Sequence, residues 1–195
     1  MVRLFTALCK SLLEIISEED AFNDASNRFN HYDKPCPRCG AIGKLTDYGD
    51  YERGLIYLKA DKTTDARVRP LRFKCESCDA SHAVLPDIII PYGRYCLSFV
   101  LKAMIMYFER KVTVVNICLQ LGIAVSTLYE WKKRMLLHKE LMLGLLISNK
   151  IPALAFLQEL LKTRNLSKSL NDFFCKYGFS FMQNRSIPAS QSHPP

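Results

Sequence analysis

The spacing of apolar residues changes near position 95 of this 195-residue chain. Beyond that point apolar side chains recur every three or four positions, which is the repeat of a helix with one buried face. This pattern predicts helices over residues 95–108, 114–121, 126–134, 153–161 and 170–177. Residues 136–148 are expected to continue the third helix or to pack onto it. The carboxy-terminal half is therefore predicted to be mainly helical.

Residues 51–58 and 67–74 have the composition of strands instead. They are rich in β-forming residues and flank a turn-like stretch at 61–65, so the sequence predicts a long β-hairpin. Side chains alternate along a strand, which separates the apolar residues of the second strand from Arg72 and Lys74. Residues 83–90 are expected to add one more short strand, giving a three-stranded ribbon.

The two ends of the chain are predicted from similar patterns. Apolar residues at helical spacing over 4–16 predict an amphipathic helix that ends near the acidic cluster Glu18, Glu19 and Asp20. This helix either packs against the rest of the protein or binds a partner or a second copy. Residues 23–34 are polar and are expected to form a connector. Residues 183–195 are polar and contain proline, so we expect a disordered tail.

Two Cys-x-x-Cys turns lie at the two ends of the predicted hairpin: Cys36 with Cys39, and Cys75 with Cys78. Each turn offers two thiolates to one ion, and four such ligands complete the tetrahedron of a structural zinc site. Two disulfides or four unrelated buried thiols are the alternatives. His82 is also near enough in sequence to serve as a ligand, or else to hydrogen-bond at the rim. The sequence predicts Zn²⁺ held by the four cysteines.

The predicted helices at 114–121 and 126–134 have the layout of a helix-turn-helix. Thr113 can cap the first helix and Gly122 can end it. Such a pair needs a small residue at the crossing, a glycine in the turn and apolar anchors on the second helix. Those roles fall to Cys118, Gly122, Ile123, Leu128 and Trp131. A generic helical hairpin is the alternative.

If the pair binds double-stranded DNA, the start of the second helix enters the major groove. Val125 suits a thymine methyl, Ser126 or Thr127 can bond a phosphate or a base, and Glu130 can accept from cytosine. Basic residues further along the helix are expected on phosphates, which adds affinity without sequence information. The predicted DNA-binding residues are Val125, Ser126, Thr127, Tyr129, Glu130, Lys132, Lys133 and Arg134.

The charge of the chain fits a polyanionic partner. Its formal net charge is +8, and residues 94–139 contain eight basic side chains against two acidic ones. A second basic cluster lies in the hairpin at Arg67, Arg69, Arg72 and Lys74. That cluster either meets phosphate or is a solvated strand edge protected by charge. No secretory signal or membrane-spanning run is visible, so we expect a cytoplasmic protein in a reducing compartment.

The order of these motifs resembles a known family. It is carried by the two cysteine pairs, His82-Ala83-Val84-Leu85-Pro86, Pro91-Tyr92 and Ser126-Thr127-Leu128-Tyr129-Glu130-Trp131-Lys132-Lys133. This order resembles an uncharacterised bacterial domain family that is similar to the amino-terminal zinc-ribbon and helix-turn-helix part of insertion-sequence transposases. The likeness covers residues 36–138. The resemblance implies binding to DNA, such as the terminal repeats of a mobile element.

The chain departs from that family in two places. Ala124 stands where a Ser or Thr normally caps the recognition helix, and losing a cap costs about 1 kcal/mol. The nuclease half of a transposase, with its metal-binding carboxylates, is missing. Asp47, Asp50, Asp61 and Asp65 are instead expected in solvated turns. We therefore expect no catalytic residues and no enzymatic activity.

Together these patterns predict an α+β fold, a small β zinc ribbon followed by a mainly helical region. The predicted parts are an amino-terminal helix and connector (1–33), the ribbon (34–92), the helix-turn-helix (93–140), carboxy-terminal helices (141–182) and a tail (183–195). The predicted function is zinc-stabilised DNA binding, with homodimer formation through the carboxy-terminal helices as one role for them. The alternative is a protein–protein adaptor that uses the ribbon and the carboxy-terminal helices.

Overall fold

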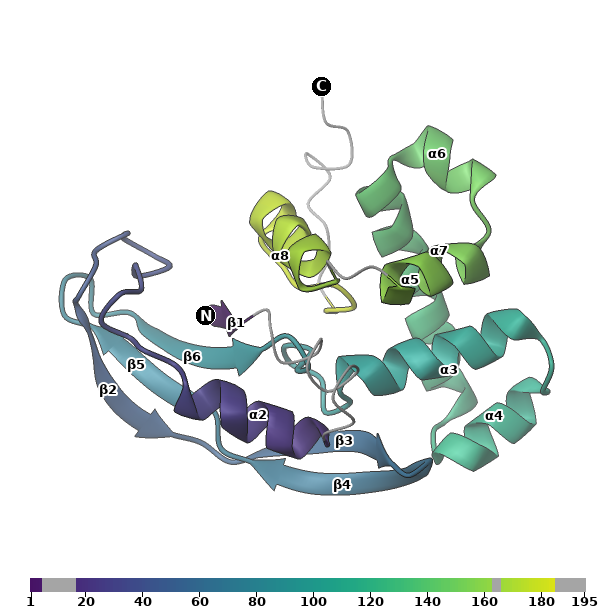
Figure 1. Cartoon of the computed structure of the whole chain (residues 1–195), viewed down its shortest axis with the longest axis horizontal. Coiled ribbons are helices and arrows are strands. Elements are labelled where there is room, and N and C mark those ends of the chain that lie inside the picture. The colour runs from purple at the N-terminus through teal and green to yellow at the C-terminus, as the bar shows by residue number, and fades with distance from the viewer. Residues whose placement is uncertain (5–16, 163–165, 185–195) are drawn as a thin grey trace.

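A computed structural model describes residues 1–4, 17–162 and 166–184. The architecture is α+β, as predicted, with β-sheets in the amino-terminal half and helices after them (Figure 1). The amino-terminal helix expected over 4–16 lies outside the described residues except at Leu4. That residue ends strand β1 (Val2–Leu4), so the expectation of a helix there is wrong at its first position.

The larger sheet has the strand order β1–β6–β5–β2. Strand β1 runs parallel to β6, whereas β5 is antiparallel to both of its neighbours. The three-stranded ribbon predicted from residues 51–58, 67–74 and 83–90 is wrong in its first strand, because residues 53–59 lie in a separate sheet. Residues 45–50, which were not predicted as a strand, take that place, and β1 adds a fourth strand at the edge. The other three strands are β2 (Leu45–Asp50), β5 (Leu71–Cys75) and β6 (Ser81–Pro86). The apolar run at residues 88–90 is buried but contributes no strand.

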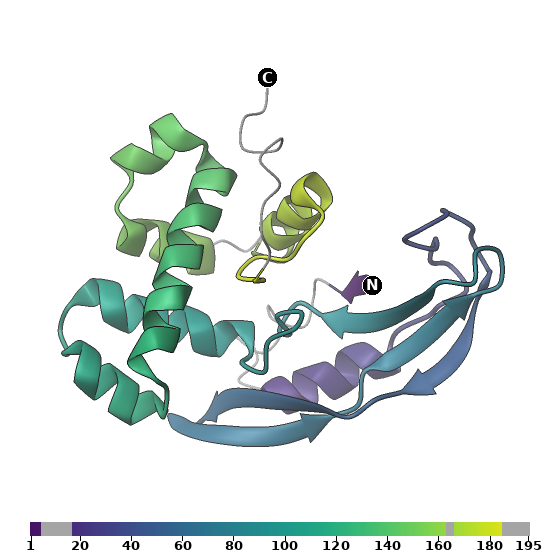
Figure 2. The same cartoon turned by 180° about the vertical axis from the view of Figure 1, so that it is seen from behind.

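A second, two-stranded sheet pairs β3 (Arg53–Lys59) with β4 (Lys62–Val68). Because β2 leads into β3 and β4 into β5, the chain forms one long curved ribbon, seen from both sides in Figures 1 and 2. A long hairpin is thus present, but the predicted pairing of 51–58 with 67–74 is wrong: residues 53–59 pair with 62–68, and beyond a break at Pro70 the second arm continues as β5 against β2. Proline has no amide hydrogen to donate to the ladder, so the pairing breaks there.

The tip of this ribbon is tighter than expected. Ala60 and Asp61 both have positive φ, at 47° and 63°, and Lys59 pairs with Lys62 across them. This is a two-residue hairpin turn, which requires left-handed backbone at both central positions. Residues 62–65, predicted as part of the turn, belong to β4 instead.

Helix α2 (Glu18–Asn27) begins at the acidic cluster. The expectation that the amino-terminal helix ends near this cluster falls on residues 5–16, which lie outside the described residues. The Ser17 hydroxyl accepts a hydrogen bond from the Asp20 amide at 3.1 Å, which caps the first turn. Carboxylates are favoured at this end because they oppose the positive pole of the helix dipole. The polar stretch expected as a connector from residue 23 is consequently helical as far as Asn27.

The helices after residue 95 lie close to their predicted positions. The third predicted helix is longer than residues 126–134: it runs from Val125 to Leu143, and a short helix follows it, which agrees with the expectation that residues 136–148 continue it or pack onto it. The helices are α3 (Leu97–Glu109), α4 (Val114–Leu121), α5 (Val125–Leu143), α6 (Leu145–Lys150), α7 (Ala153–Lys162) and α8 (Leu166–Tyr177). Gln183, predicted to start the tail, is buried and accepts a hydrogen bond from the Ser180 amide at 2.9 Å.

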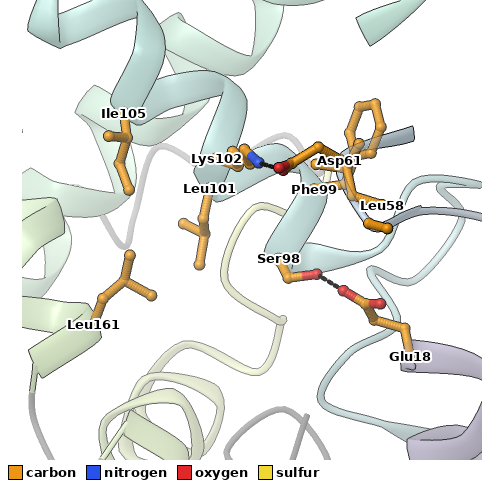
Figure 3. Close-up of a pocket in the computed structure, with 10 residues that line it drawn as sticks. Glu18, Leu58, Asp61, Ser98, Phe99, Leu101, Lys102, Ile105 and Leu161 are labelled. Carbon is orange, nitrogen blue, oxygen red and sulfur yellow. Dashed lines mark hydrogen bonds and ion pairs between the residues drawn. The ribbon is translucent and has the colours of Figure 1, made fainter. Parts of the chain in front are cut away.

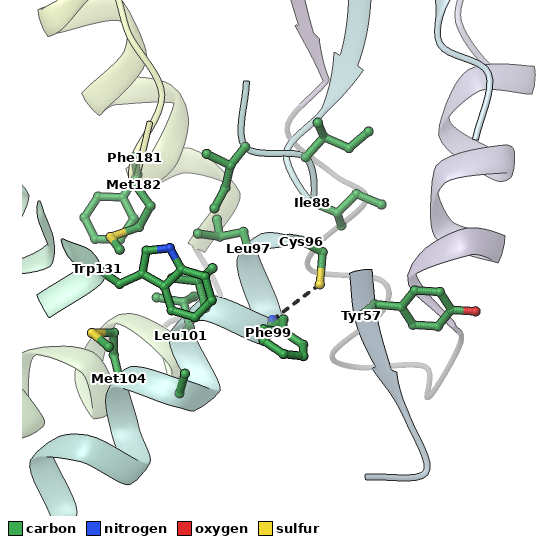
Figure 4. Packing of buried hydrophobic residues seen from close by; sticks show 14 of the residues in the cluster. Tyr57, Ile88, Cys96, Leu97, Phe99, Leu101, Met104, Trp131, Phe181 and Met182 are labelled. Carbon is green, nitrogen blue, oxygen red and sulfur yellow. Dashed lines mark hydrogen bonds between the residues drawn. The ribbon is translucent and has the colours of Figure 1, made fainter. Parts of the chain in front are cut away.

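The main hydrophobic core joins the ribbon to the helices. Tyr57 of β3 and Ile88 belong to the same buried cluster as Phe99 and Trp131 (Figure 4). The aromatic ring of Trp131 contacts Tyr95 edge-on, with centroids 4.9 Å apart. Strands from residues 53–68 and the helices therefore share one core.

In the described part of the chain no single helix is long and apolar enough to cross a membrane. The pair α4 and α5 has the length and composition only when taken together, and it is bent by 104° at the break.

Candidate metal centre and helix-turn-helix

The four predicted cysteine ligands come together at the end of the ribbon farthest from the helices. Their Sγ atoms all lie within 4.8 Å of one another. The Sγ atoms of Cys36 and Cys78 are 3.7 Å apart, and those of Cys39 and Cys75 are also 3.7 Å apart. Four sulfurs at zinc–sulfur bond length on a tetrahedron stand about 3.8 Å apart, whereas a disulfide needs about 2.05 Å. The spacing fits one metal ion and does not fit two disulfides.

The two cysteine turns have the same backbone construction. In each turn the amide four residues after the first cysteine donates to that cysteine's carbonyl at 2.9 Å, from Gly40 to Cys36 and from Asp79 to Cys75. Gly40 has φ +76° and Asp79 has φ +60°, so both turns close through left-handed backbone. Asp is one of the few side chains that adopt this conformation at modest cost. The pseudo-symmetry brings two pairs of thiols face to face.

Hydrogen bonds make one of the four thiols acidic. Burial of Cys36 opposes its ionisation, but the backbone amides of Cys39 and Arg38, together with the His82 ring, lower its pKa to about 5. At Cys78 the Ala80 amide also favours the thiolate. Burial and the neighbouring sulfurs outweigh that amide and raise the pKa to about 12. Without a cation, charge on one sulfur opposes charge on the next, which is the electrostatic situation that a divalent ion relieves.

His82 is buried beside the cluster but is not one of the four grouped ligands. Its Nε2 atom lies 3.3 Å from the Cys36 sulfur, and its Nδ1 atom lies 3.1 Å from the amino group of Met1. A ring nitrogen that donates to a ligating thiolate fixes that ligand's orientation and tunes its charge. The rim position that was the alternative to ligation therefore fits the geometry.

The second predicted motif, α4 and α5, has the angle and caps of a helix-turn-helix. The two helices are bent by 104°, within the range of about 90–120° typical of the motif. The Thr113 hydroxyl accepts from the Asn116 amide at 3.3 Å, as its capping role requires. Gly122 has φ +64°, and the amide after it, in Ile123, donates to the Cys118 carbonyl at 3.0 Å. The turn is built from the residues that the sequence indicated.

The second helix divides cleanly into two faces. Its buried face consists of the anchors Leu128 and Trp131, followed by Met135. The exposed residues on the opposite side of the helix are Val125, Ser126, Tyr129, Glu130 and Lys133. We call these five the reading face. They are five of the eight residues predicted to contact DNA; Thr127 and Lys132 are partly buried.

Lys132 is held by aromatic rings beside that face. Its ammonium lies 5.2 Å from the centre of the Tyr107 ring and 5.9 Å from that of Tyr129. The two rings meet edge-on at 6.2 Å. Cation–π contacts of this kind contribute about 0.5–1 kcal/mol at exposed sites and restrict the lysine. Tyr107, which the sequence reasoning did not select, thus positions two of the predicted residues.

Arg134 does not fit its predicted role as a phosphate contact. Its guanidinium donates to the Met182 carbonyl at 3.3 Å, and partial burial lowers its pKa. The side chain therefore ties α5 to the segment after α8. Ala124 is the N-cap of α5 and provides no side-chain hydrogen bond, as the sequence indicated.

The basic cluster of the hairpin is largely neutralised. Arg67 pairs with Glu52, Arg69 with Asp50 and Lys74 with Asp79, and Arg72 lies 5.0 Å over the Tyr48 ring. These partners come from other strands and turns, so the cluster fits the solvated-edge alternative better than a phosphate site. Exposed pairs of this kind add little stability, about 0–1 kcal/mol each.

Part of the positive charge around the helices is also used internally. Lys102 pairs with Asp61 and Arg94 with Asp65, at the tip of the ribbon. Lys139 is buried and donates to the Ser148 carbonyl at 2.7 Å. Among the described residues Arg110, Lys132 and Lys133 have no carboxylate partner. The uncompensated charge is thus smaller than the count of basic residues implies; part of it lies on the reading face, at Lys133, and beside it, at Lys132.

Two hollows accompany these motifs. One, of about 460 Å³, lies between α2, the ribbon tip, α3 and α7 (Figure 3). Its polar side chains already bond each other, Ser98 to Glu18 and Lys102 to Asp61. The other, of about 470 Å³, is an apolar groove along α4 and the turn. It is lined by Val115, Cys118, Leu119, Gly122, Ile123, Ala124 and Val125.

Fold and site together define a small β ribbon with a four-cysteine centre, joined through a shared core to a helix-turn-helix. A family model described as a domain of unknown function (DUF6431) matches residues 36–131. The match begins at the first cysteine, ends at the Trp131 anchor and takes just under half of the chain. No curated protein and no solved structure matches the chain. The part that is similar to this family contains both motifs.

Proposed function

We propose that the four-cysteine centre holds a structural Zn²⁺ ion. Four thiolates at tetrahedral spacing support zinc, although an iron site uses the same donors. Four protein ligands leave no open coordination position, so the ion would stabilise the fold and not act on a substrate. Elemental analysis of purified protein tests the choice of metal. One zinc per chain is expected, and iron in its place would contradict the proposal.

We further propose that the zinc-stabilised protein binds double-stranded DNA through α5. The observation that carries this proposal is the reading face, exposed on a helix whose other side is anchored in the core and which meets α4 at 104°. This is the arrangement that places a recognition helix in the major groove. Transposase-like ancestry, and with it a bacterial and cytoplasmic setting, is part of the proposal; the order of the motifs supports it.

The reading face divides by chemistry into specificity and affinity. Glu130 accepts from cytosine N4, Val125 contacts a thymine methyl and Ser126 bonds a base or phosphate. Lys133 is exposed and without a carboxylate partner among the described residues, so it is assigned to phosphate. Replacing Glu130 should therefore relax the sequence preference, while replacing Lys133 should weaken binding to all sequences alike.

Selection from a random duplex pool, with the zinc-loaded chain at two salt concentrations, tests this function. A recovered motif is expected, and Lys133→Ala should reduce the slope of log affinity against log salt by about 0.9. Arg67→Ala is the matched control. Because Arg67 is already paired with Glu52, this substitution should leave the slope nearly unchanged. Equal effects of the two substitutions, or no preference for any duplex, would contradict the proposal.

A protein–protein adaptor is the second candidate, and the apolar groove along α4 favours it. Val115 is 60% exposed and Leu119 is 76% exposed, on a helix that would lie against the DNA backbone. Apolar side chains gain nothing from phosphate, whereas they contribute directly to a protein interface. An adaptor should keep its partner when Lys133 is replaced, and lose it when Leu119 is replaced by a charged residue.

A further inference from the structure

Helix α6 is exposed where a helix is normally buried. Its three apolar residues face solvent, with Leu145 exposed to 56%, Leu146 to 80% and Ile147 to 55%. The one buried residue of α6 is Ser148, whose carbonyl accepts from Lys139. A six-residue helix is far below the length at which a helix is stable on its own. Among the described residues, these three side chains lack the apolar packing that would normally hold such a helix.

The exposed surface continues onto the end of α5. Leu136 is 38% exposed and Leu137 is 41% exposed. With the three residues of α6 they make up what we call the α5–α6 surface; α6 itself lies at the outer edge of the helical half in Figures 1 and 2. Five exposed apolar residues on two consecutive helices are more than the scattered single ones that a monomer normally exposes, and such clusters mark interaction sites.

We propose that the α5–α6 surface is the interface between two copies of this chain. Exposed Glu140 and Lys150 flank the apolar residues. In a two-fold interface the same patch meets itself, so Glu140 of one copy can lie against Lys150 of its partner. Such pairing matters because each copy has a net charge of +8. Without such pairs, the net positive charges of the two copies would repel each other across the interface.

The position of this surface also suits the proposed reading of DNA, although the dimer itself does not depend on DNA binding. Tyr129 and Leu143 are on one continuous helix, and fourteen residues at 1.5 Å each separate them by about 21 Å. Two copies joined through the end of α5 and α6 place their reading faces on either side of a two-fold axis, and dimers of this motif read paired half-sites about 34 Å apart, one turn of duplex. The DNA site of the dimer is then an inverted repeat.

Sedimentation of the zinc-loaded full chain over a range of concentrations tests the interface. The wild type is expected to reach twice the 22.4 kDa mass of one chain. Leu146→Glu should raise the dissociation constant of the dimer about 100-fold, because the charge has no partner when the interface closes. Leu146→Met, which keeps the apolar contact, should change it little.

Leu119→Glu is the matched control, since Leu119 is exposed to almost the same extent, 76% against 80%. This substitution should leave the dissociation constant of the dimer within about threefold of the wild-type value, because Leu119 lies in the α4 groove. A dimer broken by Leu119→Glu and kept by Leu146→Glu would assign the interface to that groove and overturn the proposal. A wild type that stays monomeric at all concentrations would overturn it too. A dimer that selects no DNA motif would remove the proposed function and leave the interface standing.

Discussion

At the cysteine end of the ribbon the described structure has a cluster of only six buried apolar residues, and two of them are Cys36 and Cys75. At the helix end, Leu55 and Tyr57 enter the much larger core formed with α3, α5 and α8. Apolar burial stabilises a fold in proportion to area, so a cluster this small contributes little. The comparison teaches that the metal centre stands where the core is too small to hold the strands together.

The two ends also differ in charge. Around the cysteines, Lys44 is paired with Glu76 and Lys74 with Asp79. On the reading face Lys133 has no such partner in the described chain. A surface whose charges are already paired gains less from a polyanion than one with free cations. Metal and charge therefore point to separate tasks, stability at one end and binding at the other.

The largest effect is expected from disrupting the metal site, which should weaken the cysteine end of the ribbon and spare the helical end. Cys75→Ser, at a position with no exposure, should cost several kcal/mol, because structural zinc contributes directly to folding. Hydrogen exchange should show protection lost in β2 and β5 and kept in α3 and α5. Cys175→Ser is the control, since that thiol is exposed. Equal loss of protection at both ends would mean that the helical core also depends on the metal.

Acid sensitivity should locate a second weak point, within the helical half. His138 is buried among Phe173, Phe179 and Phe181. Its Nδ1 accepts from the Met182 amide at 2.8 Å. Burial, and secondarily Arg134, lowers its pKa to about 4. Because the unfolded state binds the proton near pH 6.5, this residue's contribution to stability falls as the pH drops from 6.5 to 4.

The expected size is about 2 kcal/mol between pH 7 and pH 5. Urea unfolding of the wild type and of His138→Gln, both zinc-loaded, measures it as the difference in pH dependence between the two. Loss of zinc in acid affects both proteins and cancels from that difference. If the two proteins lose stability in parallel, the acid response belongs to the cysteine end alone.

The smallest expected effect concerns the unfilled cap of α5. Ala124→Ser supplies the missing acceptor and should stabilise the protein by about 0.5–1 kcal/mol in thermal or urea unfolding. Thr113→Ala, which removes the working cap of α4, should cost a similar amount. Both changes should persist with zinc bound or chelated if the helices are independent of the metal. A gain seen only with zinc would show that the two ends are coupled.

Local signals in the sequence were enough for much of the helical half. Thr113 and Gly122 bound α4 at the predicted residues because capping and left-handed turns depend on short-range chemistry. The same holds for Gly40 and Asp79 in the cysteine turns. The four ligands could be chosen from spacing alone, and the structure brings their sulfurs together.

What could not be predicted depends on contacts distant in sequence. Arg69 pairs with Asp50, and Arg134 bonds Met182, through partners that only the folded chain brings near. Residues 23–27 are polar enough to predict a connector, yet they belong to α2, because its few buried residues, Ala21, Phe22 and Ala25, gain their partners only in the folded chain. Burial of His138 left no periodic signal strong enough to distinguish it from a surface residue.

The parallel pairing of β1 with β6 has a consequence for the order in which the chain folds. Val2 is paired with Val84, so a strand that is synthesised before the ribbon waits for one of the ribbon's last strands. Closing so long a loop is entropically costly and makes such contacts slow. We expect β1 to dock last, onto an edge prepared by the antiparallel strands. Pulsed hydrogen exchange during refolding should show the β6 edge protected later than the β3–β4 hairpin.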